Sequence, residues 1–416
     1  MARRDGALRS RHPATLMLGG LLRSGKLRTG LVFGLAALAF AGANLLLAHQ
    51  MAPEAYGMVS LVVALTAVGS PLAPLGLAPI VVREHLPATP RLLGQCAATS
   101  ALVAAVTAAV AAAVYGLPAV ELGALVAAVV GGGFIRLAAA VLQSEERFVA
   151  STLASESMNY LLLLAAVGVF ALGPAAPAWP LGFAAAAQLA LAGGVWVRLL
   201  ATEGRRDAAA AIGTPPWLAE MLLLTGVTGA AVILLQVERF AIPLFLDLET
   251  LAGFAVLAVF AIGPFRPVEV GTYRTLMPRL RRAASPKERR RALLREAAHT
   301  AAVLVPLGLA LLVAIPVALA LFFPGKYQFA LGTVLAAVVG GQLRVARSVI
   351  AAALSALADR PGLAWWNAVS WASVAAAFVG GGIGSRWGLQ GLLWGVAAAG
   401  VANIALSLPL IVRHLR

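Results

Sequence analysis

Six arginines lie inside long apolar stretches of the chain, where charged side chains are rare: Arg136, Arg239, Arg266, Arg274, Arg344 and Arg347. Glu238 and Glu269 are the acidic residues deepest among them. A charge that faces lipid at the centre of a membrane-spanning helix costs about 2.5 to 3.5 kcal/mol, so these side chains are expected to face the interior of a helical bundle. Because the basic residues outnumber the acidic ones, ion pairs within the group cannot neutralise them all. The sequence therefore predicts a cationic, water-filled cavity that is open to anions.

The spacing of these residues places several of them on shared helix faces. Arg344 and Arg347 are three residues apart, as are Arg266 and Glu269, and residues three apart are neighbours on a helix surface. Arg274 follows Arg266 by two turns and lies near the same stripe. We expect this set of arginines to hold a substrate.

Arg266 is the strongest candidate for the cavity, because Pro264 and Pro267 flank it near the middle of its apolar stretch. Prolines loosen a membrane helix where a substrate site or a gate often lies. Arg136 and Arg274 lie nearer the ends of their stretches, where snorkelling or an interhelical ion pair explains an arginine equally well.

Few other residues have the type and spacing for chemistry. Glu238 and Glu269 could couple transport to a proton or another cation, although Glu238 cannot share a helix face with its neighbour Arg239. Cys96 is the only cysteine, the five histidines are not spaced as helical metal ligands, and no phosphate-binding glycine motif precedes a lysine. The sequence predicts no metal, no cofactor and no catalytic constellation, so the protein is not expected to be an enzyme or an ATPase.

The composition indicates that lipid surrounds most of the chain. Of 416 residues, 61% are hydrophobic and 12% are charged, well away from the mixture that is usual for a soluble domain. The net charge of +15 does not indicate nucleic-acid binding, because the basic residues occupy short stretches between apolar runs rather than one face of a folded domain.

Twelve apolar runs are long enough to cross a bilayer, for which a helix needs about 20 residues. They lie at residues 29–49, 57–82, 92–116, 119–142, 151–172, 177–199, 218–246, 251–277, 298–323, 328–357, 362–384 and 388–412. Outside these runs, all of the Lys and Arg residues except Lys326 and Arg386 fall on alternate connections. Because cytoplasmic loops are enriched in basic residues, both termini are predicted to be cytoplasmic. The expected fold is an all-α membrane protein with about twelve transmembrane helices.

The runs divide into two groups of six, each beginning on the cytoplasmic side. The predicted organisation is a basic tail at 1–26, an N-terminal six-helix lobe at 27–200, a cytoplasmic linker at 201–217 and a C-terminal six-helix lobe at 218–416. Pro71 and Pro74 in the second run are echoed by Pro264 and Pro267 in the eighth, which suggests a parallel repeat. A long basic loop is expected at 278–297, where it would attract the headgroups of membrane lipids.

The turn before the second run has a distinctive sequence: His49 is followed by Met51-Ala52-Pro53-Glu54-Ala55-Tyr56-Gly57, then by a helix interrupted at Gly69, Pro71 and Pro74 and by Gly76 and Arg83-Glu84. This segment resembles the first helical hairpin of the Wzx-type polysaccharide transporters, which belong to the multidrug/oligosaccharidyl-lipid/polysaccharide exporter superfamily. In that family an LGPEEYG-like turn precedes a helix that ends in a GL…VRE-like element, and here Met51 replaces the leucine and Ala52 the glycine. Later stretches extend the resemblance over nearly the whole chain: Gln236 to Arg239, Met277-Pro278-Arg279-Leu280, Phe322-Phe323-Pro324-Gly325-Lys326-Tyr327 and Trp387-Gly388-Leu389-Gln390-Gly391.

The resemblance implies a fold and a function. It implies two six-helix lobes around a V-shaped cavity and the flipping, by alternating access, of a lipid-diphosphate-linked oligosaccharide from the cytoplasmic to the outer leaflet of a bacterial inner membrane. The polyprenyl-diphosphate-linked glycan would serve the synthesis of a surface polysaccharide such as exopolysaccharide or O-antigen. The protein would act as a monomer beside glycosyltransferases and a polymerase. In this family Glu54 and Tyr56 are structural, and the cavity arginines are not fixed in position.

Two other functions remain open from the sequence. A cation-coupled exporter of small molecules within the same superfamily should prefer acidic cavity residues, whereas arginine is in excess here. A membrane glycosyltransferase, polymerase or ligase acting on the same lipid carrier should display catalytic residues on a sizeable outer loop, whereas the predicted outer turns, such as 50–56 and 247–250, are short.

Overall fold

The computed structural model describes residues 25–173, 176–203 and 216–415, and the regular elements in these ranges are helices. Most of the predicted basic tail and of the predicted linker lies outside the described residues. The first half of the chain forms α2 (Gly25–Gln50), α3 (Pro53–Leu72), α4 (Leu77–Glu84), α5 (Pro90–Tyr115), α6 (Ala119–Ser144), α7 (Phe148–Ser155), α8 (Ser157–Leu172) and α9 (Ala178–Glu203). The second half forms α10 (Pro216–Phe245), α11 (Leu248–Ala261), η1 (Gly263–Phe265), α12 (Arg266–Arg282), α13 (Pro286–Phe322), α14 (Leu331–Leu357), α15 (Arg360–Gly384), η2 (Ser385–Trp387) and α16 (Gly388–His414).

Side-chain caps fix where several helices begin. The side chains of Thr89, Asp247, Ser285 and Asp359 each accept a hydrogen bond from the backbone N–H three residues later. Such caps satisfy backbone donors that have no partner within the helix. The first residues of α5, α11, α13 and α15 are therefore set by the residue directly before each helix.

The number of spans agrees with the sequence prediction. Ten described segments are long and apolar enough to cross a membrane, or eleven if α7 and α8, which meet at a bend of 48°, count as one span. One of these segments, Pro361–His414, contains both α15 and α16, which pack against each other. Counting these two helices separately gives the predicted twelve.

Two predicted boundaries were wrong. The basic stretch 278–297 was expected to be a loop, but α12 extends to Arg282 and α13 begins at Pro286. Ser285 caps α13, and the Lys, Arg and Glu residues that follow are good helix formers, so both helices continue beyond their apolar parts. The fifth run was expected to begin at 151, but it consists of α7 and α8, which are separated at Glu156.

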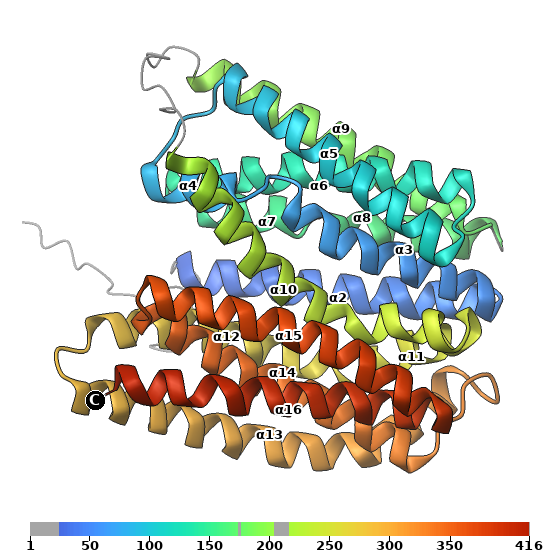
Figure 1. Cartoon of the computed structure of the whole chain (residues 1–416). Helices are drawn as coiled ribbons and strands as arrows, with labels where there is room; N and C mark the ends of the chain where they lie inside the picture. Colours follow the sequence, from blue (N-terminus) through green and yellow to red (C-terminus); the bar gives the residue numbers. More distant parts are fainter. Residues whose placement is uncertain (1–24, 174–175, 204–215, 416) are drawn as a thin grey trace, which may run out of the picture.

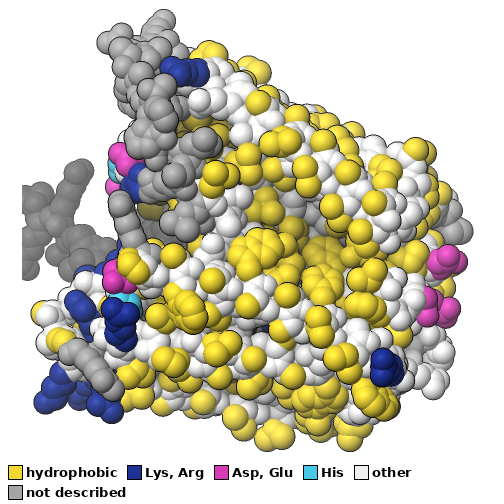
Figure 2. All heavy atoms as spheres, in the orientation of Figure 1, with side chains coloured by type: hydrophobic (Ala, Val, Ile, Leu, Met, Phe, Trp, Pro, Cys, Tyr) yellow, Lys and Arg dark blue, Asp and Glu magenta, His cyan; other side chains and the backbone are white. Residues whose placement is uncertain are grey.

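The helices form two groups that lie side by side (Figure 1). The group α3 to α9 occupies the upper part of the view and α11 to α16 the lower part, and α2 and α10 run between them. Helix α2 packs on α7 and α8, whereas α10 packs mainly on α15 and α3. We call the end of the bundle where α12 meets α13 the basic end; Figure 2 shows Lys and Arg gathered there, while apolar side chains cover the flank.

The two groups make close contact through α3 and α11 at the end away from the basic end. A Cβ atom added at Gly57 would collide with the backbone carbonyl of Leu248, so only glycine allows this approach. Further along the same span, Gly76 adopts the left-handed backbone (φ +75°) and lies against the backbone of Met221 in α10. The break between α3 and α4 thus serves close packing between the groups.

Candidate functional site

The site begins with an ion pair between two helices. Arg344 of α14 donates to Glu238 of α10 at 2.7 Å, and the side chains are 16% and 8% exposed. Removing one partner of such a pair would leave the other charge buried without compensation. The pair links α10, which runs between the two groups, to α14 of the C-terminal group, and Arg347 lies one turn further along α14.

Glu269, in the first turn of α12, lies among three arginines. It is within electrostatic range of Arg344, Arg266 and Arg347. This arrangement follows from the packing of α12 on α14, together with the start of α12 at Arg266 directly after the break. The three positive charges exceed the charge of Glu269 and Glu238 together, so the group keeps a net positive charge.

Aromatic residues of α2 complete the group from the other side. The guanidinium carbons of Arg266 and Arg274 lie 5.9 and 5.7 Å from the centre of the Phe33 ring, and that of Arg239 lies 5.8 Å from the Phe40 ring. An aromatic face attracts a cation at such distances. Sequence analysis missed Phe33 and Phe40, because phenylalanine is ordinary in an apolar run; their separation by two helical turns places them on one face of α2 but does not by itself mark a site.

Arg136 of α6 joins the group from the N-terminal half. Its electrostatic neighbours are Glu156, at the break between α7 and α8, and Arg266. Glu156 also accepts a hydrogen bond from the side chain of Asn159 at 2.8 Å. Glu156 is a further residue that sequence analysis missed, since it lies where two helices were expected to be one.

The structure therefore brings all six predicted arginines together between the two groups of helices. Arg239 interacts with Arg344 and Arg266, Arg266 interacts with Arg136, and Arg274 shares the Phe33 ring. Arg266 and Arg274 are exposed, whereas the other four are partly buried. We call these six arginines with Glu238 and Glu269 the arginine cluster.

The space beside the ion pair of the arginine cluster is small. Beside the ion pair of Glu238 and Arg344, a cavity of about 40 Å³ is lined by these residues, Arg347 and apolar side chains of α10, α14 and α16. This volume is enough for water but not for a sugar. At the junction of α2 and α12, Arg266 and Arg274 are exposed beside Phe33, so these two arginines are the members of the cluster that an anion can reach.

Hydrogen bonds close the end of the bundle opposite the basic end. The Lys326 ammonium donates to the backbone carbonyls of Ala48 (2.6 Å), Met51 (2.9 Å) and His49 (3.3 Å), at the end of α2. Burial lowers the pKa of Lys326 below its usual value. The Tyr115 hydroxyl donates to the carbonyl of Phe240 at 3.2 Å. These contacts join the two groups of helices at this end.

Comparison with known proteins identifies the fold. No protein-family model and no curated protein sequence matches the chain. Among solved structures, an inward-facing multidrug resistance transporter of the MATE family, in the MOP superfamily, is similar over 91% of this chain and 94% of its own (TM-score 0.60, 12% identity). The lipid II flippase MurJ, in an inward closed conformation, is similar over 91% of this chain and 86% of its own (TM-score 0.68, 11% identity). A further MATE structure, in complex with MaD3S, gives a TM-score of 0.56 at 11% identity, over 93% of each chain.

These similarities show the fold alone. The chain has the two-lobed, all-helical fold of MOP superfamily transporters, and the similar structures are transporters rather than enzymes. The comparisons do not single out the Wzx family within this superfamily. At these identities, neither drug export nor lipid II flipping transfers to this chain.

Proposed function

We propose that this protein flips a lipid-diphosphate-linked oligosaccharide across a bacterial inner membrane by alternating access. The observation that carries the proposal is the net positive charge of the arginine cluster, which lies between the two groups of helices. Six guanidinium groups face three carboxylates there, those of Glu238, Glu269 and Glu156, and Glu238 is already held by Arg344. A diphosphate is the part of such a substrate that would compensate this charge.

The chemistry of arginine fits that substrate. A guanidinium group is permanently charged and donates paired hydrogen bonds that match the oxygens of a phosphate. Arg266 and Arg274 are exposed and lie against Phe33, so their donors are available to an incoming anion. Arg347 and Arg239 lie deeper, where they would meet the diphosphate later in its passage.

The proposed cycle starts from the conformation described here. The Lys326 contacts hold the opposite end shut, so the glycolipid headgroup enters from the basic end, which we assign to the cytoplasm. The lipid tail stays in the bilayer while the diphosphate binds the cluster. Rocking of the two groups then opens the end at Lys326 and releases the glycan to the outer leaflet. The protein would work as a monomer beside glycosyltransferases and a polymerase.

Export of a small molecule coupled to a cation is the second candidate. Glu269 and Glu238 lie inside the cluster, where one of them could bind a proton or a metal cation during the cycle. A cationic substrate would have to approach an excess of arginines, which repels it. This repulsion is why we rank the exporter below the flippase.

Flipping of a labelled substrate in liposomes tests the proposal. Purified protein is reconstituted with a fluorescent polyprenyl-diphosphate glycan, and an impermeant quencher reports how much of it lies in the outer leaflet. We expect redistribution with the wild-type protein and loss of it in Arg266→Ala, while Arg386→Ala, an exposed arginine of η2, retains it. Export of a cationic dye without any glycolipid flipping would favour the second candidate.

A further inference from the structure

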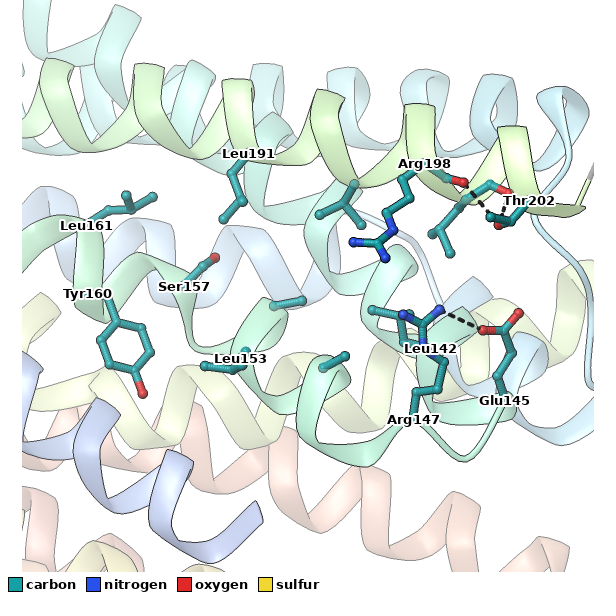
Figure 3. Close-up of a pocket in the computed structure, with 14 residues that line it drawn as sticks. Leu142, Glu145, Arg147, Leu153, Ser157, Tyr160, Leu161, Leu191, Arg198 and Thr202 are labelled. Atoms are coloured by element: carbon teal, nitrogen blue, oxygen red, sulfur yellow. Dashed lines mark hydrogen bonds and ion pairs between the residues drawn. The ribbon is translucent and has the colours of Figure 1, made fainter. Parts of the chain in front are cut away.

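A second cavity lies in the N-terminal group of helices, beside the bend between α7 and α8. Helix α9 packs on α6 and α8, but α7 diverges from α8 by 48° at Glu156. The bend leaves a cavity of about 870 Å³ between α7, α8 and α9, near the end of α6 (Figure 3). No residue of the arginine cluster lines it. Its volume is in the range of ligand-binding pockets, about 300 to 1,000 Å³.

The lining of this cavity changes from polar to apolar along its length. Arg147, Arg198 and Thr202 lie at one end of the cavity (Figure 3). Helix α9 ends there, at the basic end of the bundle (Figure 1). Leu161 and Leu191 lie at the other end, deeper along α8 and α9. A ligand that matches this gradient has an anionic headgroup and an apolar tail.

The charge of the lining favours an anion. Arg147 meets Glu145 at 3.3 Å, but the Arg147 side chain is 48% exposed and such a surface pair contributes little. Arg198 is exposed and has no ion pair among the residues that the structure describes. Two guanidinium groups therefore face one carboxylate at the polar end.

An unsatisfied hydroxyl gives an independent sign of a ligand. Ser157 lines the cavity between its polar and apolar ends and is only 5% exposed, yet its Oγ has no hydrogen-bond partner. Figure 3 shows its side chain directed into the space between α8 and α9. A buried hydroxyl without a partner destabilises the folded protein, and an acceptor oxygen from a ligand would satisfy it.

We infer that this cavity binds one anionic phospholipid from the leaflet at the basic end. The phosphate lies between Arg198 and Arg147, an ester carbonyl accepts a hydrogen bond from Ser157, and an acyl chain follows Leu161 and Leu191. The order of these three groups in a glycerophospholipid, from phosphate to ester to chain, is the order of the lining residues. The site shares no lining residue with the arginine cluster and would hold α7, α8 and α9 together at the bend.

Photo-crosslinking to the full chain tests this inference. The purified protein is incubated in mild detergent with a photoreactive phosphatidylglycerol or with a phosphatidylcholine of the same chains, and labelled peptides are mapped. We expect phosphatidylglycerol to label α7, α8 and α9 in preference to phosphatidylcholine. Arg198→Gln should lower this labelling about fivefold, the effect of one basic residue near an anionic surface.

The matched control is Arg91→Gln, an exposed arginine of α5 at the same end of the same half, which should not change the labelling. Ser157→Leu removes the hydroxyl and places a larger apolar side chain in the cavity, so it should reduce labelling by both lipids. Equal labelling by the two lipids, labelling centred on other helices, or an unchanged Arg198→Gln would overturn the inference. The preference between the two lipids is measured on the wild-type protein, so it does not depend on the folding of any variant.

Discussion

The two broken spans of the protein, α3 with α4 and α11 with α12, share an architecture but carry different side chains. Each is interrupted beside a pair of prolines, at corresponding places in the two halves. The first has charged residues only near its ends, at Glu54 and at Arg83 and Glu84. The second places Arg266 at the first position after its break and Glu269 in the next turn.

This difference shows that the same kind of break in a spanning helix serves two purposes. In the N-terminal half the break lets Gly76 lie against the backbone of α10, so it contributes packing. In the C-terminal half the break places charges where α12 faces α14 and α2. The C-terminal half thus supplies five of the six arginines of the cluster, while the N-terminal half supplies Arg136, Phe33 and Phe40.

Removing the charge of the C-terminal half should have the largest effect. We expect the triple variant in which glutamine replaces Arg266, Arg344 and Arg347 to flip glycolipid about two orders of magnitude more slowly, or slower still. The reason is that each charged hydrogen bond contributes about 1.5 to 3 kcal/mol. The liposome assay measures the rate, and the amount of folded protein is measured in parallel. Normal flipping by folded protein would contradict the assignment of charge to this half.

Breaking the ion pair inside the C-terminal half should lower stability. Glu238→Gln leaves Arg344 without its partner, and we expect the free energy of unfolding to fall by about 1 to 3 kcal/mol, less than for a fully buried pair because Arg344 keeps some exposure. Thermal unfolding in detergent reports the change. Adding Arg344→Met should recover part of the loss, and a double variant as unstable as the single one would show that the pair does not act as described.

Loosening the contact between the halves should shift the conformation. Lys326→Met removes three hydrogen bonds to the end of α2, so the end away from the basic end should open more often. Met51 is buried at this end, so Met51→Cys reports opening by its reaction with an impermeant maleimide. The native Cys96 is also buried and should not react. We expect several-fold faster reaction, whereas Arg386→Met, at an exposed position of the same end, should leave the rate unchanged.

The aromatic contribution of the N-terminal half should be the smallest. Phe33→Leu keeps an apolar side chain but removes the ring beside Arg266 and Arg274, an interaction that contributes about 0.5 to 1 kcal/mol at exposed sites. Apparent affinity for the glycolipid should fall by a few-fold with little change in the maximal rate. A loss as large as that of the arginine variants would mean that Phe33 contacts the substrate itself.

Much of the fold follows from the sequence because membrane energetics act locally. The length of each apolar run is set by the bilayer thickness, so the spans and the short turns could be read directly. The limits of the helices beyond the membrane could not, because hydropathy does not report where basic helix formers continue a helix. This is why the turn between Arg282 and Pro286 was expected to be a long loop.

The candidate site was only partly predictable, for a related reason. The cost of charge in lipid identifies which arginines face an interior, but it does not say which residues they meet there. The pairing of Arg344 with Glu238 joins residues far apart in sequence, and Phe33 and Phe40 carry no signal of their own in an apolar run. Those contacts depend on how α2, α10, α12 and α14 pack.

We propose that the charge between the two halves binds the diphosphate of a lipid-linked glycan. The most direct measurement compares the binding of two short-chain ligands to the purified protein by calorimetry, one with a diphosphate between lipid and sugar and one with an uncharged ether in its place. We predict that the diphosphate ligand binds at least about tenfold more tightly and that Arg266→Gln removes most of this difference, since a charged hydrogen bond contributes 1.5 kcal/mol or more. Equal binding of the two ligands, or a preference that survives Arg266→Gln, would contradict the proposed role of the arginine cluster.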